Sequence, residues 1–123
     1  MTVVLNHTIV PAADHRAAAD FFAGIMGLER LEPQGASGHF EPVRVNDSLT
    51  LEFMAVEDAQ PHHLAFDVDA AEFDAILARI RERGVVFGSS PREPGNGRTD
   101  HPLCERGFFF SDESGNLYEV MSA

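Results

Sequence analysis

The sequence predicts an α+β fold of one domain, residues 1–123, built from two successive βαβββ modules. Two segments, one in each half, carry apolar residues at helical spacing, whereas the other apolar runs are short and strand-like. Each half also opens with a strand-like segment that carries a histidine and closes with one that carries a glutamate. This repeated order indicates a duplicated module. With 44% apolar residues, a chain of 123 residues is long enough for one domain with a core.

The first module is expected to cover about residues 1–58. Residues 3–10 alternate in strand fashion, and a helix is expected from about Asp14, with Gly24 and Gly27 marking its end. The apolar stripe of this helix is Ala17, Ala18, Phe21, Phe22, Ile25 and Met26. Three short strands are expected next, around 29–33, 39–46 and 49–55.

The second module is expected to cover about residues 59–123. After a strand at 62–68, Asp69 offers a helix N-cap with Glu72 three residues later. The helix is expected to end at Gly84, and its apolar stripe is Phe73, Ile76, Leu77 and Ile80. The remaining strands are expected near 85–87, 106–111 and 116–121. The Pro- and Gly-rich segment Ser89–Arg106 makes this module longer than the first and is a candidate lid.

The recurring polar residues of the two modules are His7, Glu52, His63 and Glu119. Two imidazoles and two carboxylates form a nitrogen and oxygen donor set that suits a divalent metal ion. A single strand histidine is more often structural, and a single strand glutamate usually faces water. Their repeated order nevertheless favours a shared metal site over four unrelated surface residues.

Strand alternation tests whether these side chains can share a surface, because residues two apart point to the same side of a strand. The apolar row of the strand at 62–68 is expected to face the helix, and it consists of Leu64, Phe66 and Val68. This choice puts His63, rather than His62, on the opposite face. The same argument places Glu52 and Met54 opposite Leu51 and Phe53. The pattern permits one concave face that carries the four ligands.

The long segment of the second module carries further candidates for substrate binding. His101 lies in the segment and can reach a ligand, because such loops often carry function. A small basic group in this very acidic chain consists of Arg92, Arg98 and Arg106, for which charge balance is an equally good explanation. Phe109 and Met54 are candidates for the apolar wall of a cavity. Cys104 has neither an adjacent base nor a helix N-terminus, so a nucleophilic role is not expected.

Composition limits the partners and the location. A formal net charge of −11 argues against nucleic acid and anionic membranes, both of which require a basic surface. The first ten residues contain neither a basic region nor a long apolar run, so a signal peptide and a membrane span are not expected. One cysteine cannot form an intrachain disulfide, and a cytoplasmic location is expected. The expected partner is a small molecule or another protein.

Three stretches resemble the vicinal oxygen chelate superfamily, which includes glyoxalase I, fosfomycin and bleomycin resistance proteins, and extradiol dioxygenases. They are ADFFAGIMGLE at 19–29, PHHLAFDV at 61–68 and RGFFFSDESGNLYEV at 106–120. The resemblance implies the glyoxalase/bleomycin resistance/dioxygenase fold, in which each βαβββ module curls into a half-barrel. It also implies metal ligands on the first and last strand of each module, which fall on His7, Glu52, His63 and Glu119. Small members of this superfamily often form homodimers, and a homodimer is therefore expected.

The resemblance leaves two classes of function open. The first is a metalloenzyme, most similar to glyoxalase I because of the carboxylate at Glu52, acting on a small substrate with vicinal oxygens. Its chemistry is isomerisation, lyase chemistry or, with iron, dioxygenation, and Glu119 or Glu52 acts as general base. The metal is one of nickel, zinc, cobalt, manganese or iron(II). No glutathione-binding set of arginine and asparagine is recognisable. The second class is a metal-free drug-binding protein of the bleomycin resistance type, which binds an aromatic ligand through Phe and Met side chains.

Overall fold

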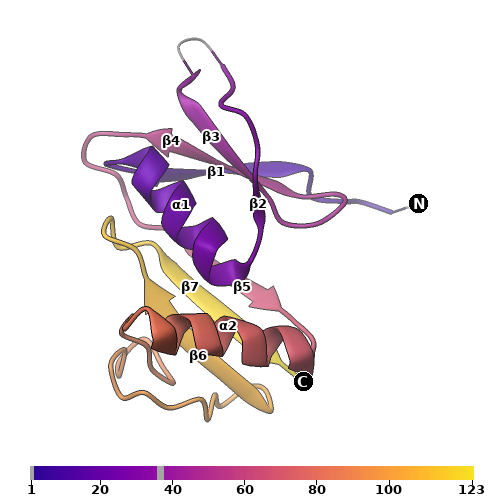
Figure 1. Cartoon of the computed structure of the whole chain (residues 1–123), viewed down its shortest axis with the longest axis vertical. Helices are drawn as coiled ribbons and strands as arrows, with labels where there is room; N and C mark the ends of the chain where they lie inside the picture. The colour runs from indigo at the N-terminus through magenta and orange to yellow at the C-terminus, as the bar shows by residue number, and fades with distance from the viewer. Residues whose placement is uncertain (1, 36–37) are drawn as a thin grey trace. The chain divides into compact units, whose positions relative to one another are not determined.

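The computed structural model describes residues 2–35 and 38–123. The chain divides into two compact units, Met1–His62 and His63–Ala123. Each unit contains one helix packed on one sheet, so the predicted α+β class is confirmed (Figure 1). Residues 1–62 form unit 1, and residues 63–123 form unit 2.

Unit 1 contains a sheet with the strand order β1-β4-β3-β2. The edge strand β1 (His7–Ala12) runs parallel to β4 (Thr50–Ala55). The next strand, β3 (Phe40–Arg44), is antiparallel to both β4 and the short β2 (Glu29–Arg30). Strands β2, β3 and β4 lie inside the predicted ranges, although only two residues of 29–33 pair with β3. Strand β1 overlaps the predicted range 3–10 but begins and ends later.

The helix of unit 1, α1 (His15–Met26), has the predicted ends. Asp14 is its N-cap, and the Asp14 carboxylate accepts the backbone N–H of Ala17 at 3.1 Å. Gly27 ends it at a φ of 71°, a left-handed conformation that glycine adopts without strain. The apolar face packs on the sheet, where the rings of Phe22 and Phe53 lie 5.8 Å apart. The helix therefore covers the face that alternation predicts.

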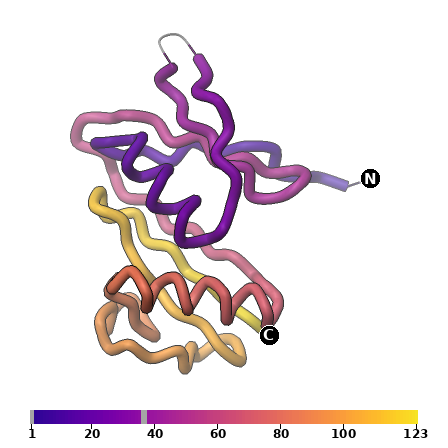
Figure 2. The backbone as a smooth tube through the Cα atoms, in the orientation of Figure 1, coloured from indigo at the N-terminus to yellow at the C-terminus, as the bar shows by residue number. Residues whose placement is uncertain are grey.

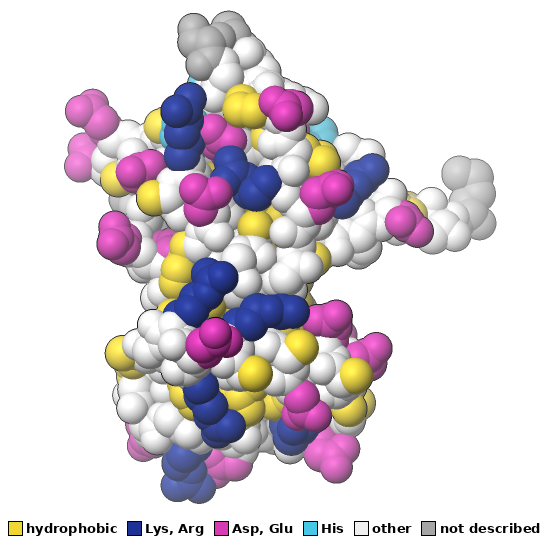
Figure 3. Space-filling model, in the orientation of Figure 1, with side chains coloured by type: hydrophobic (Ala, Val, Ile, Leu, Met, Phe, Trp, Pro, Cys, Tyr) yellow, Lys and Arg dark blue, Asp and Glu magenta, His cyan; other side chains and the backbone are white. Residues whose placement is uncertain are grey.

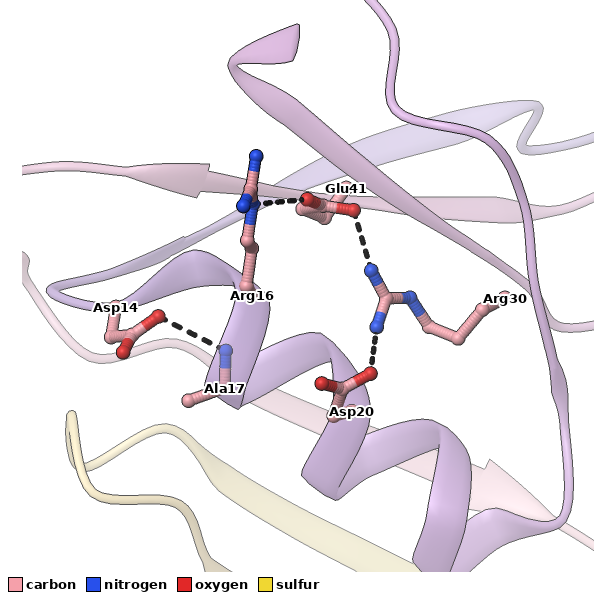
Figure 4. Close-up of polar contacts among 6 residues, drawn as sticks. All are labelled: Asp14, Arg16, Ala17, Asp20, Arg30 and Glu41. Carbon is pink, nitrogen blue, oxygen red and sulfur yellow. Dashed lines mark hydrogen bonds and ion pairs between the residues drawn. The ribbon is translucent and has the colours of Figure 1, made fainter.

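A buried carboxylate lies within this helix-covered layer of unit 1. Glu41 is 1% exposed, and it points from β3 toward α1. Arg16 of α1 donates to one oxygen of Glu41 at 3.0 Å, and Arg30 of β2 donates to the other (Figure 4). Arg30 also donates to Asp20 of α1. Four charged side chains thus tie α1 to β2 and β3, a feature that sequence analysis did not identify.

Unit 2 contains a sheet with the strand order β5-β7-β6. The strands are β5 (His63–Asp67), β7 (Leu117–Ser122) and β6 (Arg106–Ser111). Strand β5 runs parallel to β7, which is antiparallel to β6. The helix α2 (Ala70–Glu82) begins at the predicted N-cap, where Asp69 accepts the backbone N–H of Glu72 at 2.8 Å. Figure 2 follows the long connection from α2 to β6 within this unit.

The prediction of a strand near 85–87 is wrong. Only Gly88 pairs with β6, through two backbone hydrogen bonds with Phe109 of 3.1 and 2.8 Å. The chain turns back directly afterwards at a bridge between Ser90 and Glu93, so the pairing cannot extend along β6. A side chain at position 88 would also lie only 2.0 Å from the carbonyl oxygen of Glu93. The expected strand is therefore reduced to a single bridge.

Aromatic side chains fill the layer between the sheet and the helix of unit 2. Phe108 is fully buried and meets Phe73 of α2 edge-on, with ring centres 5.4 Å apart. Phe108 lies opposite Val120 in the β6–β7 ladder, so both point toward α2. The neighbours Phe109 and Glu119 are also paired, and they point to the opposite face. Side chains of β6 and β7 thus alternate between the face covered by α2 and the face that carries Glu119.

Neither helix in residues 2–35 and 38–123 is long and apolar enough to cross a membrane. On the face drawn in Figure 3, the carboxylates are spread over both units, in agreement with the net charge of −11.

Candidate functional site

The central feature of the site in unit 2 is a pair formed by His63 and Glu119. Glu119 lies opposite Ala65 in the β5–β7 ladder, so His63, two residues before Ala65, shares its face. His63 Nε2 lies 2.8 Å from Glu119 Oε1. The His63 side chain is 52% exposed, whereas that of Glu119 is 11% exposed. The pair is therefore open to a ligand on the histidine side only.

His101, from the long loop, completes the cluster on the buried side. His101 Nε2 lies 2.6 Å from Glu119 Oε2, and only 2% of the His101 side chain is exposed. His101 Nδ1 accepts the backbone N–H of Leu103 at 3.0 Å, so this nitrogen carries no proton in the neutral ring. The proton then lies on Nε2, and His101 donates to Glu119. The imidazole also stacks on Phe109, with centres 5.3 Å apart and planes 14° apart.

The turn that precedes β7 fixes the backbone position of Glu119. Asp112 Oδ1 accepts the backbone N–H groups of Ser114 and Asn116, each at 3.0 Å. Asp112 Oδ2 accepts the Asn116 side-chain amide at 3.0 Å and the Tyr118 hydroxyl at 2.9 Å. Burial, together with the neighbouring Asp112 carboxylate, raises the pKa of Tyr118 far above its ordinary value, so its hydroxyl remains a donor. Four hydrogen bonds thus hold the turn that directly precedes β7, the strand that carries Glu119.

The segment Ser89–Arg106, a candidate lid by length, is tied to its own unit. The Asn96 side chain accepts the backbone N–H groups of Ser89 and Arg98, and its amide donates to the Ser89 hydroxyl and to Glu93. Thr99 accepts backbone N–H groups from His101 and Gly107 at 3.0 and 2.9 Å. These hydrogen bonds hold the segment in place, with His101 beside Glu119.

Unit 1 contains the corresponding pair, His7 and Glu52, in the same register. Glu52 lies opposite Ile9 in the β1–β4 ladder, and His7 is two residues before Ile9. The His7 ring is exposed, and its Nδ1 lies 2.8 Å from the Asn6 side-chain oxygen. The half-buried Glu52 side chain has no hydrogen-bond or ion-pair partner in the described part of the chain. Met54 lies two residues further along the same face.

The predicted substrate-binding residues of unit 2 do not all gather at this cluster. Phe109 does, since its ring lies 5.3 Å from His101 and 6.1 Å from His63. Arg106 lies on the other face of the sheet, where its guanidinium is 4.2 Å from the centre of the Phe73 ring. Arg106 also forms an ion pair of 2.8 Å with Asp74.

Two other polar groups of the long loop are also away from the cluster. Arg98 pairs with Asp100, and this guanidinium lowers the pKa of the Asp100 carboxyl. Cys104 donates to the backbone oxygen of Arg106 at 3.0 Å, and burial raises the pKa of its thiol. A raised thiol pKa leaves little thiolate near neutral pH, which agrees with the expectation that Cys104 is not a nucleophile.

Residues 4–120 match the family model of the Glyoxalase/Bleomycin resistance protein/Dioxygenase superfamily. The chain belongs to this superfamily. The predicted membership is therefore confirmed over nearly the whole sequence. No curated protein sequence matches the chain significantly.

Solved structures similar to this chain include two proteins named as oxidases. Oxidase ChaP-H1 is 38% identical, with 99% of this chain and 97% of that chain covered and a TM-score of 0.88. Oxidase ChaP-H2 is also 38% identical, with coverages of 100% and 95% and a TM-score of 0.83. The antibiotic binding protein TnmS3 from Streptomyces sp. CB03234 is 24% identical, with coverages of 98% and 96% and a TM-score of 0.72. This third likeness shows the fold alone.

Divalent metals are common in this superfamily, so we tested whether the residues present suit one. Within the described residues, no three His, Cys, Asp or Glu side chains form a group that could hold a metal ion. However, His63 Nε2 and Glu119 Oε1 are 2.8 Å apart, close to the about 3 Å between adjacent ligand atoms of an octahedral ion. An ion would take the place of the proton between them. The His63–Glu119 pair therefore fits two positions of a metal site. His101 orients the pair through its hydrogen bond to the other oxygen of Glu119.

Proposed function

We propose that this protein is a metal-dependent oxidising enzyme that acts on a small substrate with vicinal oxygens and uses dioxygen as the oxidant. The observation that supports the metal is the His63–Glu119 pair at 2.8 Å, backed by the buried His101. The 38% identity to two proteins named as oxidases, over the whole chain, supports oxidation rather than isomerisation. For a catechol-type substrate, both atoms of dioxygen enter the product and a carbon–carbon bond is cleaved.

The proposal assigns the ligands by the repeated pattern of histidine and glutamate. His63 and Glu119 hold the ion, and the repeated pattern assigns the same ligand role to His7 and Glu52. When bound, the metal acts as a Lewis acid on the substrate oxygens and can take part in one-electron chemistry if it is iron. The chain's own residues bind the substrate, hold its oxygens and remove their protons.

Glu52 is the better candidate for a general base. His101 already holds one oxygen of Glu119, which disfavours movement of this carboxylate away from an ion. Glu52 has no partner in the described residues, so it can accept a substrate proton without breaking a hydrogen bond. Met54, two residues further on the same face, offers an apolar contact for the substrate.

Glyoxalase-type isomerase or lyase chemistry uses the same ligands, and the identity of the metal separates it from oxidation. The experiment is elemental analysis of untagged protein purified without chelator. We expect about one equivalent of metal per chain, its loss in His63→Ala and its retention in the adjacent control His62→Ala. Iron together with dioxygen consumption on catechol supports the oxidase. Activity only with nickel, zinc or cobalt supports an isomerase or lyase.

A metal-free binding protein is the second candidate. It is favoured by one observation, namely that His63, His101 and Glu119 satisfy each other's hydrogen bonds without an ion. If the purified protein takes up none of the ions above, this candidate replaces the enzyme. This candidate then predicts tight binding of an aromatic drug that is unchanged by His63→Ala.

We also propose that the protein forms a homodimer. Light scattering after gel filtration tests this proposal directly.

A further inference from the structure

We propose that His101 is a positioning residue that fixes Glu119 so that only Oε1 is presented to the metal. This inference rests on the proposed metal site. His101 donates from Nε2 to Glu119 Oε2 at 2.6 Å, on the side of the carboxylate away from His63. The side chain of His101 is 2% exposed, so it acts through Glu119 rather than by touching a substrate.

The direction of the hydrogen bond follows from the other ring nitrogen. His101 Nδ1 accepts the Leu103 backbone N–H at 3.0 Å, which leaves Nε2 as the protonated nitrogen of the neutral ring. A protonated Nε2 cannot serve as a metal ligand, but it can donate to a carboxylate. Hydrogen bonds of this kind orient the ligands of metal sites and tune their basicity.

Packing holds the His101 ring in this orientation. One face of the imidazole stacks on Phe109, with planes 14° apart. On another side the ring lies against Gly107, where a Cβ atom would come within 2.8 to 2.9 Å of three His101 atoms. Only a glycine at position 107 therefore leaves room for the ring. Phe109 and Gly107 are both residues of β6, so the sheet itself fixes His101.

The consequence for Glu119 is a single metal-facing oxygen. A carboxylate that keeps one oxygen in a hydrogen bond binds an ion through the other, and it occupies one coordination position instead of two. The position that this arrangement leaves open is available to the substrate. His101 thereby contributes to how many substrate oxygens the ion can accept.

The test measures Co²⁺ binding by the full chain, through the visible absorption of the bound ion. We expect His101→Leu to weaken Co²⁺ binding about 10- to 100-fold and to change the absorption band. His101→Gln keeps an N–H donor in a similar place and should bind within a few-fold of the wild type. Gly107→Ala displaces the ring and should behave like His101→Leu. Unchanged Co²⁺ affinity and absorption in His101→Leu would overturn the inference while leaving the metal site intact.

The failure of the proposed function is distinguishable from the failure of this inference. If the wild type itself binds no Co²⁺, the metal site and the role of His101 toward an ion both fail. If the wild type binds Co²⁺ and His101→Leu binds it equally well with the same absorption, the inference alone fails. Long-range nitrogen–proton NMR spectra of the metal-free protein check the hydrogen bond separately, with the proton expected on Nε2 of His101. A proton on Nδ1 instead would refute the proposed orientation even if a variant fails to fold.

Discussion

The two units place a histidine and a glutamate in the same strand register but give them different surroundings. In unit 2, His63 contacts Glu119 at 2.8 Å, and the Glu119 side chain is 11% exposed. In unit 1, His7 bonds to its neighbour Asn6, and Glu52 has no polar partner in the described residues. The repeated pattern thus determines the strand positions of these residues, but it does not determine how their side chains are arranged.

The part of unit 2 that has no counterpart in unit 1 makes the difference. His63 follows His7 by 56 residues, whereas Glu119 follows Glu52 by 67, so the second module is longer. The extra length lies in the loop that delivers His101 to Glu119. The additional residues of this loop therefore supply His101, the side chain that orients Glu119 beside His63.

The helix-facing layers also differ at one equivalent position. Glu41 lies opposite Phe53 on β4, and Phe108 lies opposite Val120 on β7. Unit 1 fills this position with a carboxylate held by two arginines, and unit 2 fills it with a phenylalanine among aromatic rings. The comparison predicts that the two positions respond differently to substitution.

The largest effect is expected for Phe108→Ala. Removing a fully buried phenyl ring loses apolar contact and leaves a cavity, which costs about 3–5 kcal/mol of the free energy of unfolding. Urea denaturation followed by circular dichroism measures this loss. The half-buried Phe21 is the control, because Phe21→Ala removes the same atoms from a partly exposed site. Equal losses at the two positions would contradict the aromatic core of unit 2.

Glu41→Gln is expected to have the next largest effect, a loss of about 2 kcal/mol. The variant leaves Arg30, whose side chain is 27% exposed, without its buried carboxylate, and partial exposure reduces the cost below that of a fully buried pair. The measurement is the same urea denaturation.

A triple variant, Glu41→Leu with Arg16→Met and Arg30→Met, is the matched control for this prediction. Arg30 Nε is already buried without a hydrogen-bond partner among the described residues, so the ionic network is incomplete. Apolar replacement of all three charges should therefore restore wild-type stability or exceed it. A triple variant that is less stable than Glu41→Gln would refute this reading of the network.

Local signals predicted much of the fold from the sequence. Asp14 and Asp69 cap the helices as expected, and alternation selected His63 over His62 as the residue that meets Glu119. Such features depend on a few neighbouring residues, and periodicity therefore detects them.

Features that depend on distant contacts were not predictable in this way. The strand expected at 85–87 is limited by a turn at Ser90–Glu93, which no period of two can reveal. His101 was expected to bind substrate, yet it lies buried against Glu119, 18 residues away in the chain. Glu41 looked like an ordinary strand residue, because its two arginines come from α1 and β2.

Tyr118→Phe is expected to change stability by a smaller amount, and to change its pH dependence. Loss of the hydrogen bond to Asp112 should cost about 1 kcal/mol near neutral pH. Because the folded-state pKa of Tyr118 is raised, the unfolded chain loses its tyrosine proton first as the pH rises above about 10. The contribution of Tyr118 to wild-type stability should then fall by at most about 1.4 kcal/mol per pH unit.

The alkaline comparison is simple in this chain, which has one tyrosine, no tryptophan and only arginines as basic residues apart from histidine. Burial also raises the pKa of Cys104, but that contribution is common to both proteins and cancels in the difference. The stabilities of wild type and Tyr118→Phe should therefore converge with rising pH. Parallel curves in urea denaturation would contradict a buried, protonated Tyr118.

The smallest effect is expected for Arg106→Met, which keeps an apolar stem and removes the guanidinium. The variant loses an ion pair with Asp74 and a contact with the Phe73 ring, both at a partly exposed position, and should cost less than about 1 kcal/mol. Because Arg106 lies on the helix-facing side of β6, Co²⁺ and substrate affinity should stay at wild-type values. The double variant Arg106→Met with Asp74→Ala should cost little more than Arg106→Met, since the ion pair is already lost. A fall in substrate affinity at unchanged stability would instead return Arg106 to the binding role that its basic charge first indicated.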